Sequence, residues 1–122
     1  MRVTRNAQPA SAGIMRRTLV AFLTALDIDE ATQTVIVTAV GEALANTVEH
    51  AYTDRDAGEI EMCVCTENAR TLRVDVCDRG NFVDRTRPID RGFGLKIMRA
   101  ASRSMSIDRE DGTSIRMLFD LS

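Results

Sequence analysis

Four short clusters of polar residues and glycines follow one another along this chain. They are Glu42-x-x-x-Asn46, Asp78-x-Gly80, Gly92-x-Gly94 and Gly112-Thr113. Each cluster is common by itself. Together, in this order, they indicate a pocket for a magnesium nucleotide. The pocket would be built without a P-loop, because neither Gly-Lys-Ser nor Gly-Lys-Thr occurs in the sequence.

Glu42 and Asn46 lie in a segment whose hydrophobic period predicts a helix from about Asp29 to Tyr52. At about 100° per residue, Asn46 lies about 40° around the helix from Glu42, so the two polar groups share one stripe. Apolar residues form a second stripe roughly opposite: Ile36, Val40, Leu44 and Val48. A solvated helix face often carries the same kind of pair, so the Glu42–Asn46 motif indicates a ligand site only in combination with the other three clusters.

Asp78 ends an alternating apolar strand and is followed, two residues on, by Gly80. A carboxylate at a strand end, next to a turn glycine, can present a fixed acceptor where the backbone approaches a ligand closely. An ordinary Asp-x-Gly turn has the same sequence. Further on, Gly92 and Gly94 open a predicted helix that runs to about Arg103. Glycines at a helix start leave backbone N–H groups free to meet an anion.

In this order the clusters resemble the Bergerat-type (GHKL) ATP-binding fold of histidine kinases, type II topoisomerases, the Hsp90 chaperone and anti-sigma-factor kinases. Three segments resemble the anti-sigma-factor serine/threonine kinases most: Gly41–Tyr52, Asp90–Met98 and Asp111–Ser114. The resemblance covers nearly the whole chain. It implies an α+β fold, a two-layer α/β sandwich in which helices cover one face of a mixed, mostly antiparallel sheet.

The resemblance also implies a role for each site residue. Glu42 would accept the proton of an incoming hydroxyl, and Asn46 would hold Mg²⁺ through its amide oxygen. Asp78 would accept a hydrogen bond from the exocyclic amine of adenine. The remaining members would surround the nucleotide: Gly80 and Thr113 on the adenine side, and Arg91, Gly92 and Gly94 near the phosphates.

One position departs from the family pattern. The family continues Asp-x-Gly as Asp-x-Gly-x-Gly, and here Phe82 takes the place of the last glycine. That glycine eases the chain into the lid over the nucleotide, so the change bears on the lid and the catalytic rate more than on adenine binding. The segment from Arg79 to Arg91 holds four arginines and two aspartates. Its basic side chains could close on an anion, or could simply be solvated.

Composition narrows the function classes. The chain has 122 residues, enough for one domain over residues 1–122 with a real core. A net charge of −2, four Phe, one Tyr and no Trp give little attraction for nucleic acid and little to stack on bases. We expect neither a membrane span nor a signal peptide. His50, the only histidine, ends the long helix and is expected to be structural.

The three cysteines favour a reducing cytoplasm over a disulfide framework. Neither Cys-x-x-Cys nor a histidine at metal spacing is present, which argues against zinc. Cys63 and Cys65 alternate onto one face of a predicted strand, where thiols are commonly core filler.

Hydrophobic period and turn residues predict an ordered series of elements. Strands are expected at Arg2–Ala7, Glu59–Thr66, Thr71–Asp78, Ser104–Arg109 and Ser114–Leu121, and helices at Ser11–Leu26, Asp29–Tyr52 and from the Gly92-x-Gly94 cluster to Arg103. Asn81–Arg91 is expected to be a loop, since Pro88 would interrupt a helix there.

These expectations combine into a cytoplasmic serine/threonine protein kinase of the anti-sigma type. Such a protein would bind ATP with Mg²⁺, hold a sigma factor, and phosphorylate an anti-anti-sigma (STAS-type) antagonist. It would act as a homodimer and contact neither nucleic acid nor membrane.

Three alternatives stay open. A module that binds ATP and a partner without transferring phosphate is favoured by Phe82. The catalytic domain of a histidine kinase would need an acceptor histidine on a separate helical domain, and this chain has neither the extra length nor a spare histidine. An ATPase of the topoisomerase or chaperone kind would need further domains to couple hydrolysis to motion.

Overall fold

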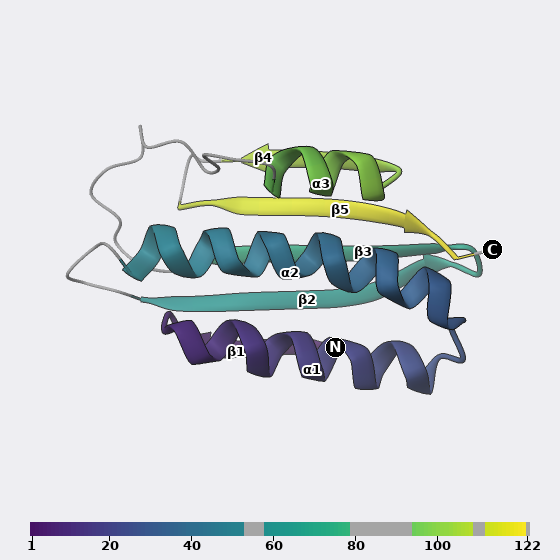
Figure 1. The fold of residues 1–122 in the computed structure, drawn as a ribbon, viewed down its shortest axis with the longest axis horizontal. Helices are drawn as coiled ribbons and strands as arrows, with labels where there is room; N and C mark the ends of the chain where they lie inside the picture. Colours follow the sequence, from purple (N-terminus) through teal and green to yellow (C-terminus); the bar gives the residue numbers. More distant parts are fainter. Residues whose placement is uncertain (53–57, 79–93, 109–111, 122) are drawn as a thin grey trace.

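The computed structural model describes residues 1–52, 58–78, 94–108 and 112–121. Within these ranges the helices and strands are arranged as drawn in Figure 1. In chain order they are β1 (Arg2–Asn6), α1 (Pro9–Ala25), α2 (Glu30–Tyr52), β2 (Glu59–Asn68), β3 (Thr71–Asp78), α3 (Gly94–Ala101), β4 (Ser104–Asp108) and β5 (Ser114–Asp120).

The strands form one sheet in the order β1-β2-β3-β5-β4, and each of the described pairings is antiparallel. The expected, mostly antiparallel sheet is confirmed, and the described pairings are antiparallel without exception. Between β1 and β2 the chain passes through two helices, α1 and α2. It re-enters the sheet at the end where β1 finished, so β2 runs antiparallel to β1. The single helix α3 does make β3 and β4 parallel to each other. However, β5 lies between them and pairs antiparallel with both.

The helices cover one face of the sheet, with α2 between α1 and α3 (Figure 1). The core lies between the two layers, because every second strand residue points toward the helices. From the sheet it takes Ile60, Met62, Val64, Leu72, Val74, Val76, Ile115, Met117 and Phe119. From the helices it takes Met15, Leu19, Leu23, Ile36, Val40, Leu44 and Met98. The two-layer α+β sandwich is therefore confirmed.

The opposite face of the sheet carries no described helix. Cys63 and Cys65 alternate with the core residues Met62 and Val64, so they point to this uncovered face. All three cysteines are free and partly buried. The expectation that Cys63 and Cys65 fill the core is therefore wrong, because the phase of β2 places its even-numbered residues inside.

Where element ends differ from expectation, they differ by one or two residues. Helix α1 starts at Pro9, before the expected Ser11, because proline suits the first helical turn, where its missing N–H is not needed. It ends at Ala25, and Asp27 then adopts a left-handed φ of 58° that turns the chain toward α2. Strand β2 extends to Asn68, and the register shift after Thr66 leaves a shorter hairpin turn than expected. Among the described helices, none is long and apolar enough to cross a membrane.

Candidate functional site

The ends of β3 and β5, two neighbouring inner strands, hold an aspartate in a fixed position. Asp78 is the last residue of β3 and Thr113 directly precedes β5, and they are 4% and 7% exposed. The Thr113 backbone N–H donates to Asp78 Oδ2 over 3.0 Å. In return, the Asp78 backbone N–H donates to the Thr113 carbonyl oxygen over 3.0 Å. We call this reciprocal pair the Asp78–Thr113 clamp. It brings together two of the predicted site residues.

Gly112 completes this corner. The sequence placed it in the Gly112-Thr113 cluster but gave it no role of its own. Its φ is +89°, a conformation that side chains other than glycine rarely adopt. A Cβ there would collide with Asp78 Oδ1 and lie 3.2 Å from the Asp78 carbonyl oxygen. The local Gly-Thr sequence signals only a turn. The need for glycine arises from Asp78, which lies far away along the chain.

Gly112→Ala is expected to lower the free energy of unfolding by about 1–3 kcal/mol, because a non-glycine residue at this φ is strained. It should also displace the Asp78 carboxylate. Urea denaturation measures the loss. Gly13→Ala is the matched control, since a Cβ there meets only Arg17 Nη1 at an ordinary 3.6 Å inside α1. That change should stabilise the fold by about 0.4–1 kcal/mol. Equal denaturation midpoints for the two variants would contradict the strain at Gly112.

Glu42 and Asn46 share a stripe of α2 as predicted, but the stripe does not lie opposite the core. Both residues are partly buried. Ala39, Ala43 and Thr47 are also buried and widen the buried arc toward them. The arc is wide because α2 packs against α1, α3 and the sheet together. The polar stripe therefore borders the core instead of facing solvent.

The side-chain nitrogen of Asn46 is buried and has no hydrogen-bond partner among the described residues. Such a group costs about 1–3 kcal/mol in the folded state, so proteins retain one where it has another use. A missing ligand is the simplest such use. The unpartnered group is an N–H donor, so it fits a hydrogen-bond acceptor such as a phosphate oxygen at this position.

Asn46→Ala is expected to raise the free energy of unfolding of the nucleotide-free protein by about 1 kcal/mol, because it removes the orphaned amide. It should also abolish the stabilisation by Mg·ATP. The neighbouring Thr47→Ala is the control. Thr47 Oγ1 donates to the Ala43 carbonyl oxygen over 2.8 Å, so its loss should destabilise by about 1 kcal/mol. Thermal denaturation with and without Mg·ATP separates the two effects, and destabilisation by Asn46→Ala would contradict a functional role for the amide.

The clamp and the stripe approach the same end of the sheet. Asp78 pairs with Ile60 near the start of β2, and the chain reaches β2 from the C-terminal end of α2. Helix α2 also packs against β3. Figure 1 shows the C-terminal end of α2 and the start of β2 at this end.

The third predicted cluster, Gly92-x-Gly94, is only partly described. Gly94 is buried and is the first residue of α3, which packs against α2. Gly80, Arg91 and Gly92 lie outside the described residues, as does Phe82. Their predicted places around a nucleotide therefore stay predictions.

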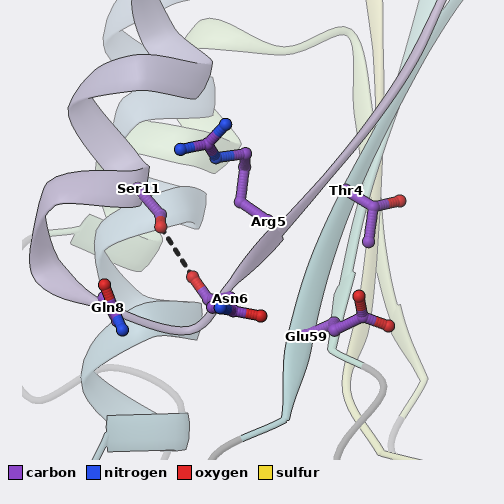
Figure 2. A pocket seen from close by; sticks show the side chains of 6 residues that line it. All are labelled: Thr4, Arg5, Asn6, Gln8, Ser11 and Glu59. Carbon is purple, nitrogen blue, oxygen red and sulfur yellow. Dashed lines mark hydrogen bonds between the residues drawn. The ribbon is translucent and has the colours of Figure 1, made fainter.

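A separate hollow of about 250 Å³ lies where β1 leads into α1 (Figure 2). It is lined by Thr4, Arg5, Asn6, Gln8, Ser11 and Glu59. The Ser11 hydroxyl donates to the Asn6 carbonyl oxygen over 2.6 Å, and the Gln8 N–H donates to the same oxygen over 2.8 Å. These two hydrogen bonds fix the backbone at the point where the chain enters α1. The hollow contains none of the predicted site residues.

Comparison with known proteins agrees with this geometry. The sequence profile of the histidine kinase-like ATPase domain matches residues 6–119. The serine-protein kinase RsbW of Oceanobacillus iheyensis is 26% identical in an alignment 127 residues long. The alignment covers 91% of this chain and 80% of that protein. It thus supports the predicted resemblance to the anti-sigma-factor kinases.

Solved structures lead to the same family. The RsbU and RsbW domains of a Mycobacterium tuberculosis protein align over 99% of this chain with a TM-score of 0.73 and 25% identity. A blue-light activated histidine kinase from Erythrobacter litoralis aligns over 74% with a TM-score of 0.61 and 26% identity. This chain spans 32% and 45% of those two chains, so it matches one part of larger proteins. Matched over almost its whole length, the chain belongs to the histidine kinase-like ATPase domain family.

Proposed function

We propose that residues 1–122 form a single domain that works in the cytoplasm as an ATP-dependent serine/threonine protein kinase of the anti-sigma type. It would act as a homodimer, sequester a sigma factor, and phosphorylate an anti-anti-sigma (STAS-type) antagonist. The observation that carries the proposal is the Asp78–Thr113 clamp, at the same end of the sheet as the Glu42–Asn46 stripe.

The clamp suits the recognition of adenine. The Thr113 N–H holds the Asp78 carboxylate in place, and a carboxylate can accept several hydrogen bonds at once. It can therefore also accept one from the exocyclic amine of adenine. Guanine has a carbonyl oxygen at the corresponding position and cannot donate. The absence of a Cβ at Gly112 keeps the position of Asp78 open.

The stripe on α2 suits the phosphate end. Asn46 would hold Mg²⁺ together with phosphate oxygens, which matches the preference of this ion for oxygen ligands. When bound, the ion would neutralise charge on the phosphates. Glu42, one helical turn before Asn46, would accept the proton of the incoming hydroxyl. Gly80, Arg91, Gly92 and Gly94 would complete the enclosure of the nucleotide.

Transfer of label from γ-labelled ATP tests the proposal. The purified chain is mixed with candidate STAS-type antagonists, and the products are mapped by mass spectrometry. The proposal expects phosphoserine or phosphothreonine on one antagonist, and none when Mg²⁺ is chelated. Binding of an antagonist and of ATP without any transfer would contradict the kinase assignment.

A second candidate is a module that binds ATP and a protein partner but transfers nothing. The feature in its favour is Phe82, which replaces a glycine of the family motif. Phe82→Gly separates the two candidates. If transfer appears only in this variant, the natural chain is the binding module.

A further inference from the structure

An apolar hollow of about 310 Å³ lies between α1 and α2, apart from the polar hollow beside β1. Among the described residues it is lined by Pro9 and Ala12 of α1 and by Ala45, Val48 and Glu49 of α2. Val48 is only 5% exposed, whereas Ala45 and Glu49 are exposed. The hollow is therefore open to solvent and has apolar residues of both helices in its walls.

The hollow adjoins the stripe of α2 that carries the proposed catalytic residue. Gly41 faces α1, because a Cβ there would meet the Arg16 side chain of that helix at 3.6 Å. Ala45 lies about 40° around α2 from Gly41, at about 100° per residue. Glu42 lies about 100° and Asn46 about 140° from Gly41 in the same direction. Glu42 is therefore placed between the hollow, on the α1 side, and Asn46, on the side away from α1.

This order separates the two substrates of the proposed reaction. Helix α2 lies between α1 and α3 (Figure 1), so the Asn46 side, where ATP would lie, is the side of α3. The acceptor hydroxyl must come within hydrogen-bond reach of Glu42 and in line with the γ-phosphate. Because the nucleotide takes one side of Glu42, the segment that carries the hydroxyl crosses the other side, over Ala45.

The spacing between Glu42 and the hollow fits an extended segment. Glu42 and Ala45 are three positions apart on a helix, so their Cβ atoms lie about 5–6 Å apart. In an extended chain, residues two positions apart point to the same side and lie roughly 6.5–7 Å apart. A segment whose hydroxyl reaches Glu42 therefore directs the side chain two positions away toward Ala45. The apolar walls offer no partner to a polar group, so they suit an aliphatic side chain.

We propose that the hollow binds an aliphatic side chain of the antagonist, two residues from the serine or threonine that receives the phosphate, and that Ala45 determines this specificity. The inference rests on the kinase function proposed above and states how the domain selects its acceptor. The aliphatic side chain covers the apolar walls. Only the methylene groups of Glu49 contact it, and the Glu49 carboxylate stays in water. A charged side chain at the same position loses its hydration against the walls and binds poorly.

Ala45→Leu tests the proposal, because leucine fills the hollow from its α2 wall. Ala45 is exposed and leucine is a good helix former, so the fold is retained. The Kd of candidate STAS-type antagonists is measured by calorimetry with Mg²⁺ and the non-hydrolysable analogue AMP-PNP, and their KM by transfer of label. We expect both constants to rise at least about tenfold, the loss expected when one aliphatic side chain is no longer buried. The Kd of AMP-PNP should not change.

Ala31→Leu is the matched control. Ala31 is also exposed on α2, but it lies about 21 Å before Ala45 along the helix and outside the lining of the hollow. It should leave the Kd of the antagonist unchanged. Equal Kd values for Ala45→Leu and Ala31→Leu would overturn the proposal, whether or not phosphate is transferred. A change in the oligomeric state of Ala45→Leu, measured by analytical ultracentrifugation, would also overturn it, since the hollow would then belong to an interface between copies.

Truncation of the antagonist tests the other side of the contact. The residues two positions before and two positions after the phosphorylated residue are replaced by alanine in turn. One truncation should weaken binding to the unsubstituted chain about tenfold but change little with Ala45→Leu, because groups in contact are coupled. Equal weakening toward both chains would overturn the docking site and leave the kinase function standing. Binding that depends on Ala45 without any transfer would instead overturn the kinase function and keep the hollow as a docking site.

Discussion

Glu42→Gln is expected to lower the rate of phosphotransfer by about 10²–10⁴-fold, the usual contribution of a general base. Glutamine keeps the size and polarity of glutamate but cannot accept the proton of the incoming hydroxyl. The side chain is partly buried at the edge of the core, so the fold should tolerate the exchange. Single-turnover transfer from γ-labelled ATP to the antagonist measures the rate.

Nucleotide affinity should change little in this variant, because the role proposed for Glu42 is toward the acceptor hydroxyl and not the nucleotide. Glu49→Gln is the matched control: it removes the same charge from the same stripe of α2, about two turns further along, where the side chain is exposed. It should transfer phosphate at close to the normal rate. Normal transfer by Glu42→Gln would show that another group accepts the proton.

Asp78→Asn is expected to weaken ATP binding by about 10–150-fold, which corresponds to about 1.5–3 kcal/mol for a hydrogen bond to a charged group. Asparagine can still accept the Thr113 N–H, so the fold should persist while the carboxylate proposed to bind adenine is lost. Isothermal titration calorimetry measures the affinity. In the unsubstituted protein, ATP at 100 times its Kd should stabilise the fold by about 2.7 kcal/mol, and GTP by much less.

Asp120→Asn serves as the control for charge, because Asp120 is exposed near the opposite end of β5 and pairs with Arg103 over 2.9 Å. It should leave ATP affinity unchanged. Equal stabilisation by ATP and GTP in the unsubstituted protein, or an unchanged affinity in Asp78→Asn, would show that Asp78 does not read the base.

The hydrophobic periodicity of the sequence predicted both ends of β3, the strand that carries Asp78, without error. Strand β3 runs from Thr71 to Asp78 as expected, because its apolar residues alternate strictly and a turn residue bounds it at each end. The long helix α2 was predicted to within one residue, since its apolar period extends over many turns. Local patterns of this kind depend only on neighbours along the chain.

Features that depend on distant parts of the chain could not be predicted in the same way. A helical wheel for α2 places Glu42 opposite the core, but it cannot show that α1 and α3 also pack against this helix. The Gly112-Thr113 pair signals a turn, whereas its contact with Asp78 requires β3 and β5 to be paired. Likewise, alternation puts Cys63 and Cys65 on one face of β2 but does not say which face the helices cover.

The order of the strands also affects how the molecule opens. The clamp joins β3 and β5, and each of these has a hydrogen-bonded neighbour on both sides, whereas β1 and β4 form the edges of the described sheet. Transient fraying begins at edges, where the fewest hydrogen bonds must break. Either edge strand can therefore detach briefly without separating Asp78 from Thr113. Hydrogen exchange of the Asp78 and Thr113 amides should therefore require global unfolding. A bound nucleotide should slow this exchange and global unfolding to the same extent.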